Sequence, residues 1–370
     1  MNLMFALCTT ITSLNLSNFN TSNILEMDSM FESCSSLLYI DMSNFDLSNV
    51  NLINYLFIDC FSLLSVDLSN IYIDELLMSF FFYDCHSLEY VNFTNGYFVP
   101  YSVFGMFFGC NSLISIDLSN FDFSQCVDMG YFFYKCTSLI SIDFPYVDVS
   151  QVSTMEGVFS DCSSLKEIDL SEWFTDSLKG MKSMFSGCNS LTYLDLRNFD
   201  TSLVTNMRNI FFNCNELTSL NIENFETSSV NDMQSMFYGC NSLVSLNVSN
   251  FDTSSVKNMK LMFFSCSELL SLDLSNFNFE STINMNSMFS NCINLEYINL
   301  YNYNDDYNIN INNLFFETSD NLVIYINKLS NTDKIKNELN SLQCITFNSS
   351  LDIKDNKRRI INDKRLCIND

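Results

Sequence analysis

Residues Met184 to Asn209 read MFSGCNSLTYLDLRNFDTSLVTNMRN, and close copies of this stretch recur along most of the 370-residue chain. The recurrence is marked by twelve cysteines: Cys8, Cys34, Cys60, Cys85, Cys110, Cys136, Cys162, Cys188, Cys214, Cys240, Cys266 and Cys292. Successive cysteines are 26 residues apart nine times and 25 residues apart twice. A fixed period of this length indicates one supersecondary unit that is copied and stacked, so the sequence predicts a solenoid.

Each copy contains two kinds of periodicity, which we count from its cysteine. Positions +6 and +8 are apolar, and position +7 between them is Asp or Asn in all twelve copies. This alternation predicts a short strand whose middle polar residue faces solvent. Later in the copy, Val256, Met259, Met262 and Phe263 have the spacing of one helix face. We therefore expect one strand and one helix in every copy.

The block L-x-x-[LI]-[DN]-L-S-N-F is typical of a leucine-rich repeat. We therefore expect an α/β solenoid, a right-handed stack with a parallel sheet on its concave face and helices on its convex face. This domain covers residues 1–325, with about twelve cysteine-containing repeats in residues 4–313 and a degenerate one after them. Residues 326–370 are predicted to form a C-terminal cap and a basic tail. We expect a last strand at Leu322–Asn327, across this boundary, and a helix at Thr332–Leu342.

The charge of the chain narrows the choice of partners. The formal net charge is −26, and it is uneven. Residues 326–370 carry nine basic and six acidic side chains, whereas the rest of the chain carries eight basic and 37 acidic ones. Such a body repels nucleic acid and anionic membrane surfaces, so we expect neither as a partner. The absence of a long apolar run also argues against membrane insertion.

The regular cysteines invite a metal or disulfide interpretation, and their spacing argues against both. Zinc sites place two ligands a few residues apart, and stacked side chains at one register point the same way. We therefore expect a row of small buried thiols at a helix end, with no metal and no cofactor. Cys126, Cys344 and Cys367 are off register. Cys344 and Cys367 are able to pair, and the sequence leaves this open.

The solvent-facing positions of the strands supply the candidate binding face. Position +7 gives a line of Asp and Asn, and position +5, two residues earlier, gives Ser or Tyr in most copies. The candidates are Asp41, Asp67, Asp117, Asp143, Asp169 and Asp195, together with Tyr39, Tyr90 and Tyr193. Tyr beside Ser and Asn is typical of recognition surfaces, which favours a face that binds protein or glycan. The alternative is that these polar residues only keep the sheet hydrated and unpaired.

No catalytic or metal site emerges from the motifs. His86 is the only histidine, so a Ser-His-Asp arrangement has a single candidate, and that residue lies inside a repeat. There is no Gly-rich phosphate loop and no compact calcium loop, although stacked carboxylates attract Ca²⁺. We expect a protein that is not an enzyme. A separate aromatic stretch, Phe80–Tyr83 with Gly96–Tyr101, is either an exposed contact patch or a local variation of the core.

The unit M-F-x-x-C-x-S-L-x-x-[LI]-[DN]-L-S-N-F-D-T-S-x-V-x-N-M resembles the 25–26-residue leucine-rich repeat of the BspA-like surface-protein family. The resemblance covers Met4 to about Phe316. It implies a cell-surface or extracellular protein that adheres to host or matrix proteins, and it implies no catalytic residues.

The start of the chain leaves an alternative open. Met1 to Cys8 already follows the repeat and has no basic leader, so no signal peptide is visible. Either a cap precedes this sequence in a longer protein or the first repeat protects itself. The missing signal also keeps open an intracellular scaffold for protein–protein interaction. The ligand and the oligomeric state stay undetermined.

Overall fold

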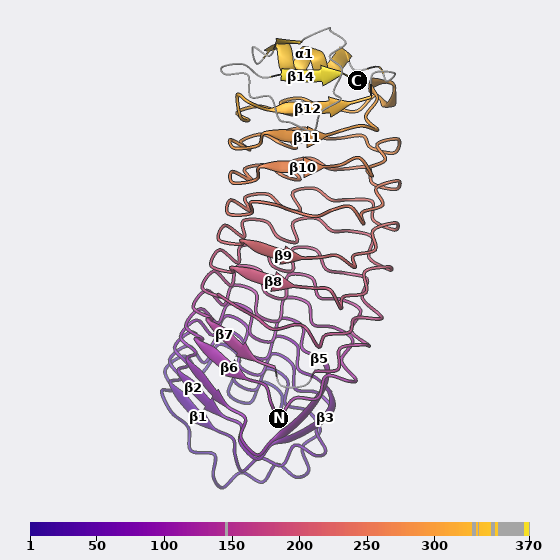
Figure 1. The fold of residues 1–370 in the computed structure, drawn as a ribbon. Coiled ribbons are helices and arrows are strands. Elements are labelled where there is room, and N and C mark those ends of the chain that lie inside the picture. Colours follow the sequence, from indigo (N-terminus) through magenta and orange to yellow (C-terminus); the bar gives the residue numbers. More distant parts are fainter. Residues whose placement is uncertain (145–146, 328–330, 332, 342–344, 347–365, 370) are drawn as a thin grey trace. The chain divides into compact units, whose positions relative to one another are not determined.

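The computed structural model describes every residue except 145–146, 328–330, 332, 342–344, 347–365 and 370. The chain forms two compact units, Met1–Asp200 and Thr201–Asp370. Each unit is a stack of rungs, and each rung is one copy of the repeat (Figure 1). Neighbouring strands pair in parallel, so the predicted repeat solenoid is confirmed.

In Met1–Asp200 six strands have three residues and lie at +5 to +7, one residue earlier than the alternation at +6 to +8 predicts, so that the apolar +6 residue is in the middle of the strand. They are β1 (Tyr39–Asp41), β2 (Ser65–Asp67), β4 (Tyr90–Asn92), β6 (Ser115–Asp117), β7 (Ser141–Asp143) and β8 (Tyr193–Asp195). β1, β2 and β4 form one sheet, and β6 pairs with β7. Two longer strands, β3 (Tyr72–Leu77) and β5 (Tyr97–Ser102), pair with each other. They lie in the 25-residue copies, which lack the usual polar run.

In Thr201–Asp370 the stack ends in a five-stranded sheet with the order β10-β11-β12-β14-β13. The elements of this unit are β9 (Ser219–Asn221), β10 (Ser271–Asp273), β11 (Tyr297–Asn299), the 3-10 helix η1 (Asp305–Tyr307), β12 (Val323–Ile326), α1 (Asp333–Ser341), β13 (Ile345–Thr346) and β14 (Leu366–Asn369). The strand predicted at Leu322–Asn327 and the helix that follows it are confirmed as β12 and α1.

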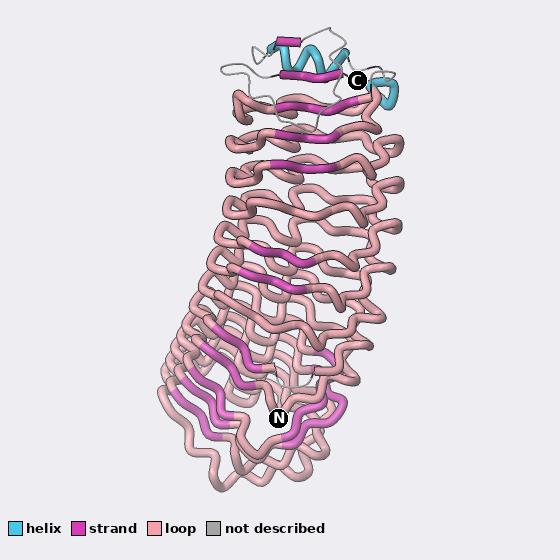
Figure 2. The backbone as a smooth tube through the Cα atoms, viewed as in Figure 1, coloured by secondary structure: helices cyan, strands magenta, loops and turns pink. Residues whose placement is uncertain are grey.

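The helix predicted in every repeat is wrong. Among the described residues, α1 is the only α-helix, and the segment before each cysteine is a series of turns (Figure 2). The cause lies in two backbone positions, −5 and −1 from the cysteine, which are left-handed in all twelve copies. In one copy these are Leu261 and Ser265, with φ of 59° and 58°. An α-helix needs a run of right-handed residues, so it cannot pass through either position.

The hydrogen bonds of this segment show what replaces the helix. The N–H groups of Met259, Leu261 and Phe263 donate to carbonyl groups of the next rung, as in Phe263 to Met288 at 2.9 Å. The N–H groups between them close turns within their own rung, as in Met262 to Met259 at 3.2 Å. Alternate N–H groups therefore donate hydrogen bonds to the next rung and within their own rung. In this way the backbone hydrogen bonds of the segment are made without a helix.

Aromatic stacks fill the core, as predicted. Phe at −3 stacks on the same residue of the next rung, for example Phe31 on Phe57 at 5.2 Å and Phe237 on Phe263 at 5.4 Å between ring centroids. All four rings are fully buried. Burial of each ring contributes roughly 1.5–3 kcal/mol, so this column is a main source of stability.

The cysteine row lies directly against the aromatic column. Eleven of the twelve regular cysteines are buried, and Cys8 is partly exposed. The Cys60 Sγ donates a hydrogen bond to the Phe31 carbonyl at 3.1 Å, and Cys266 does the same to Phe237 at 3.1 Å. The predicted row of buried thiols is confirmed, except that each thiol follows a turn and not a helix. The open question of a Cys344–Cys367 pair lies outside the side chains that the structure describes.

Candidate functional site

The nine candidate residues all belong to the unit Met1–Asp200, and we call them the strand face. In the first sheet Tyr39 pairs with Ser65, and Ser65 pairs with Tyr90. Two positions further along the same strands, Asp41 pairs with Asp67. The parallel register therefore places exposed phenol groups in one row and carboxylates in the row beside it. The exposed fractions are 46% for Tyr39 and 56% for Tyr90.

The other candidates lie along the same strand position of later rungs. Asp117 and Asp143 pair across β6 and β7. Tyr193 and Asp195 both belong to β8, and Tyr193 is 49% exposed. Asp169 occupies the equivalent position in a rung where no strand is assigned, and its side chain is exposed. Asp67 and Asp195 are half-buried.

The alternation of Asp and Asn at +7 has a structural cause that the sequence reasoning missed. In eleven of the twelve copies one side-chain oxygen of this residue accepts the N–H of the residue two positions later, as Asp41 does from Ser43 at 2.9 Å. Asp143 is the exception, because the residue two positions later is Pro145, which has no N–H. Asp117 accepts from Ser119 at 2.8 Å, and Asn92 accepts from Thr94 at 3.1 Å. A carboxylate and an amide oxygen serve equally well here, which explains why both residue types occur. The signal was the run [DN]-L-S, which is typical of an Asx turn.

The carboxylates of the strand face differ in their surroundings. Hydrogen bonds from the Ser171 side chain and backbone lower the pKa of Asp169. The Arg197 guanidinium lowers the pKa of Asp195 and donates to it through Nε at 2.8 Å. Both carboxylates are therefore charged at neutral pH. Tyr39 has a raised pKa because it is partly desolvated and because Asp41 and Asp67 are close, so its hydroxyl stays protonated.

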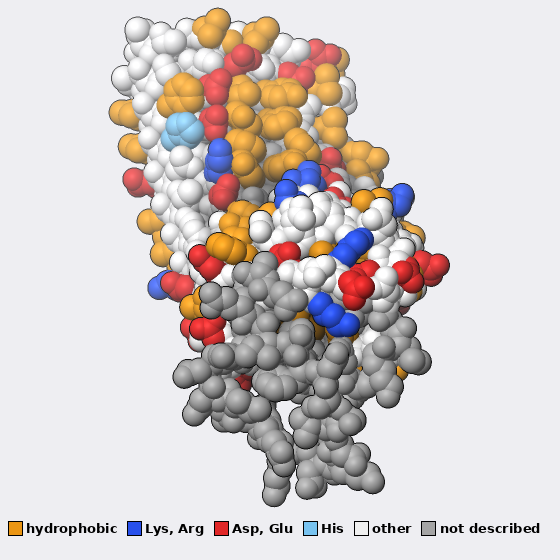
Figure 3. Space-filling model, turned by 90° about the horizontal axis from the view of Figure 1, so that it is seen from above, with side chains coloured by type: hydrophobic (Ala, Val, Ile, Leu, Met, Phe, Trp, Pro, Cys, Tyr) orange, Lys and Arg blue, Asp and Glu red, His pale blue; other side chains and the backbone are white. Residues whose placement is uncertain are grey.

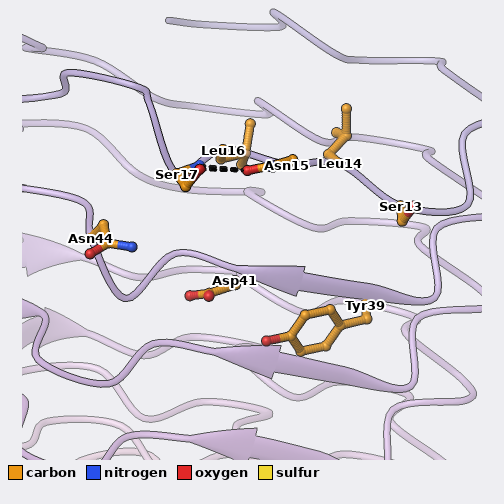
Figure 4. Close-up of a pocket in the computed structure, with 8 residues that line it drawn as sticks. All are labelled: Ser13, Leu14, Asn15, Leu16, Ser17, Tyr39, Asp41 and Asn44. Carbon is orange, nitrogen blue, oxygen red and sulfur yellow. Dashed lines mark hydrogen bonds between the residues drawn. The ribbon is translucent and has the colours of Figure 1, made fainter.

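A pocket of about 330 Å³ opens at the first rungs of the strand face (Figure 4). It is lined by Ser13, Leu14, Asn15, Leu16, Ser17, Tyr39, Asp41 and Asn44. The Asn15 Oδ1 accepts a hydrogen bond from the Ser17 Oγ at 2.7 Å, and Tyr39 and Asp41 come from the neighbouring strand. The pocket therefore offers hydroxyl, amide and carboxylate groups for hydrogen bonding to a polar side chain.

No group of three or more His, Cys, Asp and Glu in the described part of the chain is arranged to hold a metal ion. In the same part of the chain, no helix has the length and apolar character needed to span a bilayer. The hydrogen-bonding groups of the strand face are thus the chemistry that the candidate residues provide.

The sequence matches the profile of a family described as "Mycoplasma protein of unknown function, DUF285", over residues 1–92, 101–217, 179–303 and 205–328. Comparison with curated proteins gives no match. One similar solved structure is a leucine-rich repeat protein from Bacteroides ovatus, with 20% identity, 86% of this chain and 92% of that chain covered, and a TM-score of 0.43. Another is a leucine-rich cell surface protein from Faecalibacterium prausnitzii, with 15% identity, 77% and 86% covered, and a TM-score of 0.34. These structures are of the repeat class that the sequence resembles.

Proposed function

The chain belongs to the DUF285 family, whose function is unknown, and on that premise we propose from its surface that it is a non-enzymatic protein that binds other proteins through the strand face. The ligands we expect are host or matrix proteins met at a cell surface. The partner surface presents groups that hydrogen-bond to tyrosine hydroxyls and carboxylates.

One observation carries this proposal. Position +5 is half-buried at Ser65 in β2 and exposed in the other described strands of this series, and it changes between Ser and Tyr from rung to rung. A serine at this position is compatible with the strand, because Ser65 pairs with Tyr39 on one side and with Tyr90 on the other. A tyrosine adds a large amphipathic ring at little entropic cost, which is the usual property of binding anchors. The tyrosines therefore add binding capacity that the fold itself does not require.

The experiment removes the tyrosines without disturbing the strands. The full chain is passed over immobilised extracellular-matrix proteins, and Tyr39→Ser with Tyr90→Ser is compared with the control Tyr72→Ser. Tyr72 is 64% exposed but lies on β3. We expect the double variant to bind about thirtyfold more weakly, since a loss of about 1 kcal/mol at each of two truncated anchors sums to about 2 kcal/mol. No saturable binding, or equal losses in both variants, contradicts the proposal.

A second candidate is an intracellular scaffold that binds protein through the same face. The observation that favours it is the set of buried free thiols, because free cysteines are common where the compartment is reducing. Protease treatment of intact cells distinguishes the two locations. Degradation of the chain supports the surface protein, and protection supports the scaffold.

A further inference from the structure

A second surface of Met1–Asp200 is built from aromatic rings at the turns before the cysteines. One column consists of Tyr83, Phe108 and Tyr134, with ring centroids 4.5 and 4.6 Å apart. The column beside it consists of Tyr55, Phe80, Phe104 and Tyr131, with separations of 5.3, 5.1 and 5.5 Å. Phe80 contacts Tyr83, and Tyr131 contacts Tyr134, so the columns touch. We call these seven residues the aromatic surface.

The aromatic surface is not part of the core. Its rings are half-buried, and Tyr55 is 39% exposed, whereas the core phenylalanines in the same turns are fully buried. In each rung the buried cysteine and leucine, such as Cys85 and Leu88, separate it from the strand. It is therefore distinct from the strand face, and an interaction there goes beyond the proposed function.

Three of the seven rings occupy backbone positions that disfavour them. Tyr55, Phe80 and Tyr131 have φ of 59°, 55° and 56°. Most other copies place Ser, Asn or Gly at this left-handed position. Bulky L-residues rarely adopt this conformation, so the fold is better served by the small residues. Backbone strain that the fold does not need often marks a functional surface.

Carboxylates lie beside the rings. Asp84 follows the column residue Tyr83 directly, and Asp59 occupies the same position of the preceding copy. The pKa of Asp59 is raised, first by desolvation and then by the charges of Asp84 and Glu32, with His86 acting the other way. Within the described part of the chain, neither Asp59 nor Asp84 forms an ion pair. A cation placed here would relieve the repulsion between them.

Aromatic rings flank this charged row on both sides. Phe61 stacks on His86 at 5.4 Å, and Phe61 is 42% exposed. Figure 3 shows rows of hydrophobic side chains on one side of a line of charged side chains, and the histidine on the other. At the position of Asp59 and Asp84 in a later copy, the Lys135 Nζ lies 5.3 Å from the centroid of the Tyr134 ring. A cation on this surface thus already makes a cation–π contact.

We propose that the aromatic surface, together with Asp59 and Asp84, binds a basic segment of a partner protein. Lysine and arginine side chains of that segment lie over the exposed ring faces, with their charges beside the two carboxylates. Cations are attracted to the faces of Tyr and Phe rings, and the carboxylates add charge complementarity. An anionic partner is repelled by the same carboxylates, and a neutral apolar segment leaves them without a counter-charge.

The test uses a fluorescein-labelled peptide in which Lys and Arg alternate with Gly and Ser, and a matched peptide with Gln in place of each basic residue. Fluorescence anisotropy with the full chain gives the two affinities. We expect the basic peptide to bind at least tenfold more tightly. Equal binding of the two peptides overturns the proposal.

Three variants locate the binding. Tyr83→Leu with Phe108→Leu and Tyr134→Leu keeps apolar area but removes ring faces, and we expect about tenfold weaker binding. Asp59→Asn with Asp84→Asn should weaken binding by a similar factor. The control Asp232→Asn with Asp252→Asn changes the net charge equally in Thr201–Asp370 and should change affinity less than twofold. An equal loss in the control means general charge attraction and overturns the proposal.

A fourth variant predicts a gain, which misfolding cannot mimic. Lys135→Asn removes the cation that already covers the Tyr134 ring. Asn is suited to the left-handed position, as Asn213 shows at the same place in another copy, with φ of 57°. We expect the basic peptide to bind two- to fivefold more tightly. Unchanged or weaker binding contradicts a site at these rings.

Discussion

Replacement of Asp117 separates the structural role of the strand face from its binding role. The Asp117 Oδ1 accepts the Ser119 N–H at 2.8 Å, and this bond closes the turn after β6. Asp117→Ala removes the acceptor, whereas Asp117→Asn keeps an oxygen in the same place. Loss of a side-chain acceptor for a backbone N–H costs about 1 kcal/mol, so we expect that loss for Ala and less than ~0.5 kcal/mol for Asn.

The measurement combines urea denaturation with native-state hydrogen exchange of the Ser119 amide. Denaturation alone is insufficient, because long repeat arrays unfold with incomplete cooperativity. Exchange at Ser119 should accelerate by about fivefold for Ala, as expected for a local loss of 1 kcal/mol, and little for Asn. If Ala and Asn lower stability equally, the negative charge and not the acceptor matters, and the Asx-turn reasoning fails. A binding test on this face should therefore use Asp→Asn, since Asp→Ala mixes loss of charge with loss of the turn.

Two further predictions concern the core and the C-terminal unit. Burial raises the pKa of Cys34 to about 11, and the pKa of other regular thiols is raised for the same reason. In the unfolded chain the thiols ionise near pH 8.5–9, whereas in the folded chain they stay protonated. The free energy of unfolding should therefore be fully retained below that range and fall as the pH rises towards 11. Urea titrations at pH 8 and pH 10 measure this difference. Asp305→Ala should release α1, because the buried Asp305 carboxylate accepts the Lys334 N–H at 2.6 Å and the Tyr303 hydroxyl at 2.7 Å. We expect a loss of about 2–3 kcal/mol in local stability, seen as faster amide exchange in α1, and protection that is unchanged would refute this role.

The strands and the aromatic core were predictable because their signals have one physical interpretation. Three residues at +5 to +7 alternate in exposure, as Tyr39, Ile40 and Asp41 do in β1, and only a strand gives a period of two. Phe31 and Cys34 recur at a fixed offset in every copy, so they had to form continuous buried rows.

The helix was mispredicted because apolar spacing alone does not distinguish a helix from this series of turns. Met259, Met262 and Phe263 point inward in both cases, since turns closed by bonds to the third preceding residue also repeat at three. The discriminating signal was the residue type at −5 and −1, as in Ser183 and Gly187. Small residues that tolerate positive φ recur there at a spacing of four, and a helix has no need of them.

The candidate surfaces were predictable only in part, because exposure depends on which side of the backbone a residue lies. The aromatic stretch Phe80–Tyr83 was recognised in the sequence, but its middle residues, Phe81 and Phe82, are fully buried. Only Phe80 and Tyr83 contribute to the aromatic surface. Four of the other rings lie at the same offsets in neighbouring copies, and Phe104 is one residue earlier, so the signal was a column across repeats and not a run along the chain.

Comparison among the repeats of this one chain separates residues that build the fold from residues that add to it. Position −3 is always Phe, and the rings there form the core. Position +7 varies only between Asp and Asn, and the shared oxygen closes a turn. Positions +5 and −5 differ from these two, because the residue type there is not fixed by the fold. Position +5 is Ser at Ser65 and Tyr at Tyr39, and position −5 is Ser at Ser183 and Tyr at Tyr55. At −5 the larger residue even opposes the backbone conformation. The rings at these two positions are therefore the residues whose presence the fold does not explain, and apart from Tyr297 on β11 they lie in the unit where we place the two binding surfaces.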